Sequence, residues 1–169
     1  IPGLLHKSEA GGVALDINAD TASETYKRLS QLGPDKSKSN KVLVETFVPK
    51  GVEALVGITS SSLGKVLTIG VGGVLTEVIS DVAVRLLPVD SKIVNEMIDE
   101  TRLAILFSGV RGAAASNRDA FVDTVLRITD AVIDWPSGCE LDINPLTVLP
   151  EGAWVLDSAY SPPAISSER

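Results

Sequence analysis

The sequence is poor in the side chains that most often build disulfides and metal sites. Its 169 residues include one cysteine, Cys139, and one histidine, His6. A single cysteine cannot form an intrachain disulfide, so we expect a reducing compartment and a cytoplasmic location. A single histidine excludes any metal site built from paired histidines and leaves one imidazole for acid, base or nucleophilic chemistry.

Basic charge and long apolar runs are also scarce. Lysine and arginine number 15 against 22 aspartates and glutamates, which gives a net charge of −7. We therefore expect no nucleic-acid partner and no anionic membrane, because both need a basic surface. The longest apolar stretch, residues 66–76, is interrupted by glycines and is shorter than the roughly 18 residues of a membrane span. Neither standard glycine-rich nucleotide fingerprint occurs.

The length of the chain corresponds to one domain, or at most two small lobes, at about 100–200 residues per domain. The apolar content of 44% is high, and so is the mean hydropathy of +0.24. Both values indicate surface that more chain or another subunit covers, so we expect an oligomer. Ile1 stands where a complete chain would begin with methionine, which favours an origin inside a longer protein.

Short segments rich in β-branched residues predict the strands. They are residues 11–18, 41–48, 52–60, 65–70, 81–87, 140–149 and 153–157. The turn sequence Pro-Lys-Gly at 49–51 predicts a hairpin between the second and third of them. Pro-Glu-Gly at 150–152 predicts another hairpin between the last two.

Three segments have the periodicity and caps of helices. Thr21 and Glu24 have capping-box spacing at the start of a helix that ends near residue 32. A second helix should begin at Asp90 or Ser91, and a longer one after Asn117. The strands and helices do not alternate regularly, so we expect an α+β fold, a largely antiparallel sheet packed against helices on one face.

Three oxygen-bearing side chains are predicted to converge on the last hairpin. Asp142 and Asn144 lie two residues apart on a strand and therefore share a face, while Asp157 lies near the end of the facing strand. Two carboxylates and an amide suit Mg²⁺, although the same residues are typical of hairpin ends. Pro145 removes a backbone donor, which predicts an edge or a bulge at this point.

Other candidates have a functional and a structural interpretation. The glycine-rich residues 70–73 could bring backbone N–H groups to a phosphate or simply form a tight connection. Glu45 and Glu53 flank the predicted first hairpin turn and could be solvated carboxylates. His6 is a potential nucleophile or a solvated terminal residue. Cys139 fits a small buried residue at a strand start better than a nucleophile.

Four separate segments of the sequence together indicate a protein family. They are HKSEAGGV at 6–13, VLVETFVPKGVEALVGIT at 42–59, IGVGGVLTEVISDVAVRLLP at 69–88 and ELDINPLTVLPEGAWVLD at 140–157. In this order they resemble the ATP-grasp domain of the NDP-forming acyl-CoA synthetases, which are relatives of the nucleotide-binding subunit of succinyl-CoA synthetase. The resemblance covers residues 1–160 as a partial ATP-grasp domain and leaves 161–169 as a tail or linker.

The resemblance implies an acid-thiol ligase reaction. In this family acyl-CoA, ADP and phosphate are converted to carboxylate, CoA and ATP, and a phosphohistidine carries the phosphoryl group from an acyl phosphate to the nucleotide. The His-Lys motif of the family falls on His6. A neutral imidazole nitrogen is a good nucleophile near pH 7, because its unperturbed pKa is about 6.5.

The resemblance also assigns nucleotide contacts for ATP or ADP. Glu45 would lie near the adenine amino group, and Glu53, eight residues later, would reach the ribose. Phe47 and Val48 would offer backbone groups to the adenine.

The metal and phosphate contacts follow from the same resemblance. Asn144 and Asp157 match the residues that bind Mg²⁺ in the family, with Asp142 as an adjacent helper. The residues that would face the transferred phosphate are Gly72, Gly73 and Arg85.

The family pattern continues upstream with a helix, a strand and a lysine that touches the nucleotide phosphates. We expect this chain to start after them, to be inactive alone, and to act with CoA-binding domains or a CoA-binding subunit. One alternative is the regulatory ATP-grasp domain of a protein lysine acetyltransferase. Another is a non-catalytic interaction module that has kept the fold.

Overall fold

The computed structural model describes residues 11–32, 41–73, 81–110 and 112–163. The chain divides into two compact units, Ile1–Val48 and Pro49–Arg169. His6 lies outside the described residues, so its role stays a prediction.

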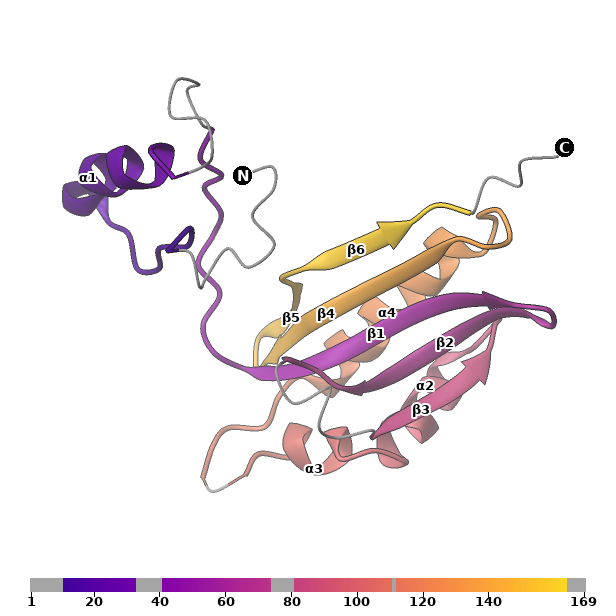
Figure 1. Cartoon of the computed structure of the whole chain (residues 1–169). Helices are drawn as coiled ribbons and strands as arrows, with labels where there is room; N and C mark the ends of the chain where they lie inside the picture. Colours follow the sequence, from indigo (N-terminus) through magenta and orange to yellow (C-terminus); the bar gives the residue numbers. More distant parts are fainter. Residues whose placement is uncertain (1–10, 33–40, 74–80, 111, 164–169) are drawn as a thin grey trace, which may run out of the picture. The chain divides into compact units, whose positions relative to one another are not determined.

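The first unit contains helix α1 (Ala19–Ser30), which confirms the predicted helix (Figure 1). The Asn18 side chain accepts hydrogen bonds from the backbone N–H groups of Asp20 and Thr21, at 3.0 and 3.1 Å. Thr21 Oγ1 in turn accepts from the Asn18 N–H at 3.2 Å. Asn18 is therefore the N-cap residue of this capping box and Thr21 is its N3 residue. The prediction that Thr21 is the N-cap residue was wrong. The strand predicted over 11–18 was also wrong, because those of its residues that the structure describes pair with no other strand.

The second unit is built on a six-stranded antiparallel sheet in the order β3-β2-β1-β4-β5, in which β6 also pairs with β4 (Figure 1). The strands are β1 (Val52–Ser61), β2 (Gly64–Val71), β3 (Val82–Leu86), β4 (Glu140–Leu149), β5 (Gly152–Val155) and β6 (Ser158–Ser161). Five of them correspond to predicted strands. Strand β6 was missed because its sequence, Ser-Ala-Tyr-Ser, contains no β-branched residue.

The predicted hairpin between residues 41–48 and 52–60 was wrong. Strand β1 pairs with β2 along one edge and with β4 along the other, so Val56 lies opposite Ile69 on one side and Ile143 on the other. Both edges of β1 are therefore occupied, and residues 41–48 form no strand. The true hairpin joins β1 to β2 through the turn that ends at Gly64.

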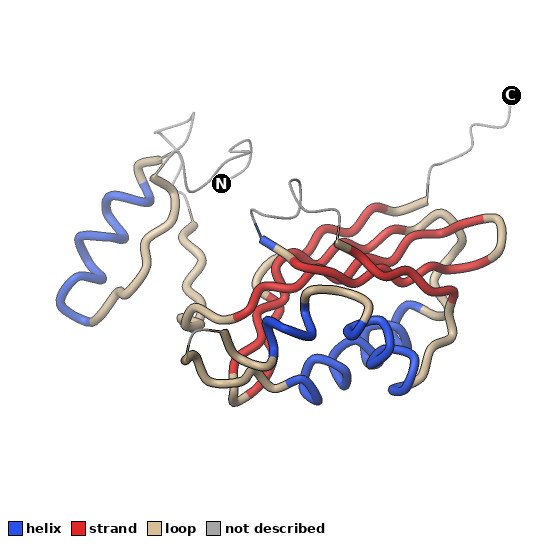
Figure 2. The backbone as a smooth tube through the Cα atoms, turned by 90° about the horizontal axis from the view of Figure 1, so that it is seen from below, coloured by secondary structure: helices blue, strands red, loops and turns tan. Residues whose placement is uncertain are grey.

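Helices α2 (Ser91–Asp99), α3 (Leu103–Phe107) and α4 (Arg118–Val132) cover one face of the sheet (Figure 2). Asp90 caps α2 by accepting from the Ile93 N–H at 2.8 Å, and Asn117 caps α4 by accepting from the Ala120 N–H at 2.9 Å. Both predicted helix starts are confirmed, as is the α+β architecture. Within the described ranges, every helix is too short or too polar to cross a membrane.

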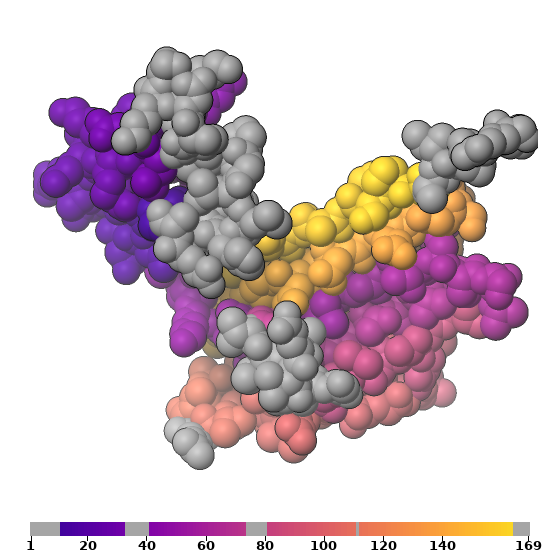
Figure 3. Space-filling model, in the orientation of Figure 1, coloured from indigo at the N-terminus to yellow at the C-terminus, as the bar shows by residue number. Residues whose placement is uncertain are grey.

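The hydrophobic core fills the space between the helices and the sheet. Its largest fully buried side chains come from both layers and include Phe121, Leu67, Ile69, Met97, Ile98, Leu103 and Leu146. Because side chains alternate along a strand, Ala54 and Val56 enter this core while Glu53 and Leu55 point to the opposite face. This opposite face of the sheet, which α2, α3 and α4 leave uncovered, is called the helix-free face below and is turned toward the viewer in Figure 3. The polar side chains of the candidate site come from it.

We expect substitution of Leu67 by alanine to destabilise the second unit by about 2–5 kcal/mol, because the side chain is fully buried and would leave a cavity. Leu63→Ala is the matched control. Leu63 lies in the β1–β2 turn and is 80% exposed, so its loss should change the free energy of unfolding by less than about 0.5 kcal/mol. Urea denaturation measures both values, and similar losses in the two variants would contradict this description of the core.

Candidate functional site

The candidate site begins at a β-bulge in strand β4. The register of β4 with β1 shifts beside Leu55, so that Asn144 and Pro145 together lie opposite this one residue. Ile143 points into the core, and Asp142 and Asn144 on either side of it point to the helix-free face. The predicted bulge is confirmed. The alternative of an edge strand was wrong, because β4 is paired on both sides.

The amide of Asn144 reaches across β1 to the glycine-rich end of β2. Its Oδ1 accepts a hydrogen bond from the Gly73 N–H at 2.7 Å, while the Gly72 N–H donates to the backbone oxygen of Glu53 at 2.9 Å. A Cβ atom on Gly73 would lie 1.8 Å from Oε2 of Glu53, and φ at this residue is +72°. The positive φ therefore favours glycine at position 73, and the Glu53 carboxylate would have to move if this residue carried a Cβ atom.

Asp157 and Asp142 lie on the other side of Asn144. The Asn144 N–H donates to the backbone oxygen of Asp157 at 3.3 Å, and the Asp157 carboxylate accepts from the Ser158 N–H at 2.9 Å. Partial burial raises the pKa of Asp142, and the negative charge of Asp157 raises it further. The two carboxyl groups are therefore close enough to repel each other.

The residues at this point fit a hard divalent cation such as Mg²⁺. Two carboxylates and an amide oxygen supply the oxygen donors that Mg²⁺ prefers, and a cation between the carboxylates would relieve the repulsion that raises the pKa of Asp142. In the described part of the chain no three His, Cys, Asp or Glu side chains form a metal-binding group. Coordination here would thus depend on Asn144 and on oxygens of a bound substrate.

The expectation that Arg85 faces the same site needs correction. Arg85 is paired with Leu67 in the β2–β3 register, and Leu67 points into the core. Paired residues of neighbouring strands share a face, so Arg85 lies on the face that the helices cover. There its guanidinium forms an ion pair with Glu100, at the end of α2.

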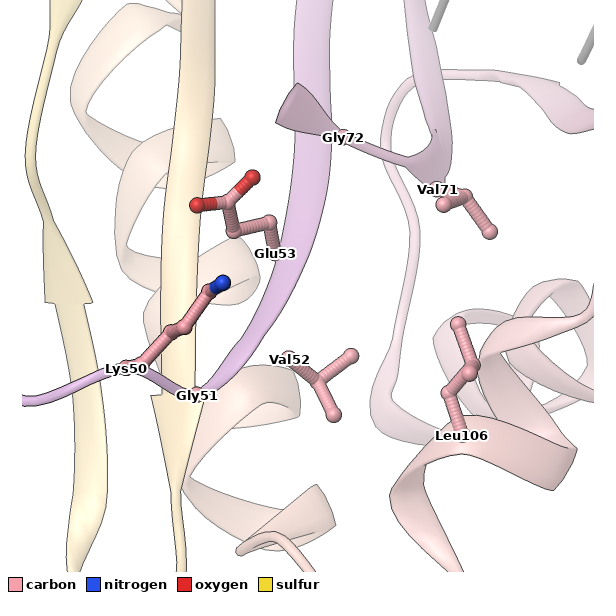
Figure 4. A pocket seen from close by; sticks show the side chains of 7 residues that line it. All are labelled: Lys50, Gly51, Val52, Glu53, Val71, Gly72 and Leu106. Atoms are coloured by element: carbon pink, nitrogen blue, oxygen red, sulfur yellow. The ribbon is translucent and has the colours of Figure 1, made fainter. Parts of the chain in front are cut away.

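A cavity of about 260 Å³ opens beside Glu53, at the end of the sheet. Its lining residues are Lys50, Gly51, Val52, Glu53, Val71, Gly72 and Leu106. In Figure 4 the Lys50 and Glu53 side chains lie on one side of β1, whereas Val52, Val71 and Leu106 form an apolar wall on the other. Sequence reasoning missed Lys50, although its position three residues before Glu53 was a signal. The volume suits part of a ligand rather than a whole drug-sized molecule.

The remaining predicted residues lie elsewhere. Glu45, Phe47 and Val48 belong to the first unit, where they form no regular secondary structure and the Glu45 and Phe47 side chains are exposed. Their contacts with adenine stay predictions. Cys139 is buried at the start of β4, as expected, and its Sγ lies 3.3 Å from the Tyr160 hydroxyl.

We expect Asp142→Asn to raise the melting temperature at pH 7. Because the folded-state pKa of Asp142 lies above the unfolded value, ionised Asp142 lowers stability at neutral pH. The gain should shrink as the pH falls and vanish below about 3.9, the ordinary pKa of aspartate, where the carboxyl is neutral in both states. Thermal unfolding across this pH range measures the gain, with the exposed Asp16→Asn as control. A gain that does not depend on pH would contradict the assignment.

Comparisons with known proteins identify the family to which this chain belongs. The family model of the ATP-grasp domain matches residues 1–160. The chain is 32% identical over 160 residues to the ADP-forming acetate–CoA ligase I of Archaeoglobus fulgidus, and the match covers 92% of this chain but 23% of that protein. It is 30% identical over 163 residues to the beta subunit of ADP-forming acetate–CoA ligase I of Pyrococcus furiosus, with coverage of 93% and 70%.

A solved structure has the same fold. The dinucleotide-forming acetyl-coenzyme A synthetase 1 of Ca. Korarchaeum cryptofilum, in complex with coenzyme A and Mg-AMPPCP, matches with a TM-score of 0.81 at 27% identity. The match covers 95% of this chain and 72% of that chain. Together, the family match and the relatives show that this chain belongs to the ATP-grasp domain family, in the form present in ADP-forming acetate–CoA ligases.

Proposed function

We propose that this chain is the Mg-nucleotide-binding part of an ADP-forming acyl-CoA synthetase. The reaction would convert acyl-CoA, ADP and phosphate to carboxylate, CoA and ATP. The observation that supports this proposal best is the convergence of Glu53, the Gly72–Gly73 backbone, Asn144 and the two aspartates on one helix-free face. The carboxylate and amide groups supply oxygen donors for a cation, and Gly73 carries no side chain that would keep a phosphate away from them. Phosphoryl transfer requires such positioning and neutralisation of charge.

Mg²⁺ would be held by Asn144 and Asp157, with Asp142 beside them. When bound, the ion neutralises phosphate charge and orients the transferred group. The hydrogen bond from Gly73 to Asn144 Oδ1 joins the metal donors to the glycine loop. Phosphates held near that loop would therefore lie next to the cation.

The nucleoside would extend along the sheet from this point. Glu53 would accept hydrogen bonds from the ribose hydroxyls, and the cavity beside it would take up part of the ligand. Glu45 would approach the adenine amino group, and the backbone groups of Phe47 and Val48 would hydrogen-bond the ring.

His6 would be the phosphate acceptor. A neutral imidazole nitrogen would attack the phosphorus of an acyl phosphate and release the carboxylate, and a terminal oxygen of ADP would then take the phosphoryl group from the histidine. The Korarchaeum enzyme contains a phosphohistidine segment that points towards its nucleotide-binding site, which supports the same role for His6.

The remaining partners would be CoA-binding domains or a CoA-binding subunit, together with further copies in an oligomer. The chain spans 23% of the Archaeoglobus ligase, so the other steps would belong to chain outside these residues. A cytoplasmic location rests on the unpaired Cys139. The relatives described above are ligases, which favours this function over a regulatory domain of a lysine acetyltransferase or a non-catalytic module.

We expect Asn144→Ala and Asp157→Asn to weaken Mg-ADP binding by about tenfold or more, because each removes an oxygen donor or a charge at the cation. Isothermal titration calorimetry of Mg-ADP into the full-length protein measures the dissociation constants. Asp130→Asn is the matched control, since Asp130 is exposed on α4, in the layer that covers the opposite face. Equal affinities in all four proteins would contradict the metal site.

Phosphorylation of His6 is tested separately. After incubation of the full-length protein with Mg-ATP labelled at the γ-phosphate, we expect a protein-bound label that is stable in base and labile in acid. His6→Asn should abolish this label and leave Mg-ADP affinity unchanged, because the acceptor is distinct from the nucleotide contacts. A histidine-type label that persists in this variant would rule out His6 as the acceptor.

A further inference from the structure

Thr147 has a buried hydroxyl group that the nucleotide site described so far does not use. Across the residues that the structure describes, its Oγ1 is the single buried side-chain nitrogen or oxygen without a hydrogen-bond partner. Thr147 is 2% exposed. Burial of an unpaired hydroxyl is unfavourable, and a valine of the same shape would avoid the penalty. An unsatisfied group of this kind therefore calls for a partner.

The position of Thr147 points to that partner. Thr147 lies directly opposite Glu53 in the β1–β4 register. Its neighbours Leu146 and Val148 belong to the core, so Thr147 points to the helix-free face together with Glu53. Paired residues of antiparallel strands have Cβ atoms about 4.5–5.5 Å apart. A glutamate side chain can cross this separation.

In this structure the Glu53 carboxylate lies beside Gly73, on the side of β1 away from Val71 (Figure 4). Its Oε2 occupies the place of a side chain at Gly73, at the end of β2. Thr147 lies opposite Glu53 on β4 and has no partner for its Oγ1 among the described residues, so Gly73 and Thr147 are two alternative neighbours of the same carboxylate. Phosphates held beside Gly72 and Gly73 would be repelled by a carboxylate at this place.

We propose that Thr147 is a positioning residue that binds the Glu53 carboxylate when nucleotide is present. Glu53 would turn from Gly73 to Thr147 and accept a hydrogen bond from Thr147 Oγ1. A carboxylate has about four acceptor sites, so the others stay available for the ribose hydroxyls. The movement would clear the glycine loop for phosphate and fix Glu53 for the ribose in a single step. This inference rests on the nucleotide-binding function proposed above.

The test compares Thr147→Val, which keeps the shape, with Thr147→Ser, which keeps the hydroxyl. The Thr147 methyl group packs beside Gly51, so valine preserves this contact and should keep or raise the melting temperature. Calorimetry on the full-length protein should show Mg-ADP binding about tenfold weaker in the valine variant and nearly unchanged in the serine variant, because the hydrogen bond is made to a charged group.

A ribose analogue separates positioning from a purely structural role. With the Mg²⁺ complex of 2′,3′-dideoxy-ADP, the valine variant should lose less affinity relative to the wild-type protein than it loses with Mg-ADP. The ribose contribution of Glu53 is then absent from both proteins, and only the effect of the carboxylate on the phosphates remains. Equal losses for both nucleotides would instead indicate structural damage and overturn the inference.

Two other results would overturn it. One is unchanged Mg-ADP affinity in the valine variant, which leaves the proposed function intact. The other is a serine variant as weak as the valine variant, which would assign the effect to the methyl group. If the wild-type protein does not bind Mg-ADP at all, the proposed function and this inference both fail.

Discussion

The hydrogen bond from Gly73 to Asn144 is the interaction on which the candidate site depends. It joins the end of β2 to the bulge of β4, two strands that β1 separates. The bulge turns the Asn144 side chain to the helix-free face, and the positive φ at Gly73 gives its N–H the matching direction. The predicted metal donors and the glycine loop thereby form one site.

Negative charge dominates this site. Glu53, Asp142 and Asp157 lie on one face of a chain whose net charge is already −7, and mutual repulsion contributes to the raised pKa of Asp142. A nucleotide would add further negative charge. In the proposed function, binding would therefore require a cation near Asn144 and a place for the Glu53 carboxylate away from the phosphates. The buried Thr147 hydroxyl on β4 would provide the partner for that carboxylate.

Sequence patterns predicted most elements of the second unit, because their signals are local. Asp90 and Asn117 cap helices where they were expected, and the β4–β5 hairpin follows its turn sequence. The wrong hairpin prediction arose because two segments had equally strong strand patterns. Residues 41–48 are as rich in β-branched residues as β2, yet both edges of β1 pair with β2 and β4. The five-residue helix α3 was missed because it is too short to show a periodicity.

The sequence by itself determined the composition of the site. It contains one histidine, an Asp-x-Asn pair before a proline, a later aspartate, and a glycine run that only a close backbone approach or a tight connection explains. Tertiary structure decided which of these residues meet. Strand pairing places Asn144 within hydrogen-bond distance of Gly73, and it places Thr147 opposite Glu53. It also places Arg85 on the helix-covered face, where it forms an ion pair with Glu100. Such contacts depend on sheet order and register, which long-range pairing sets and which no local pattern specifies.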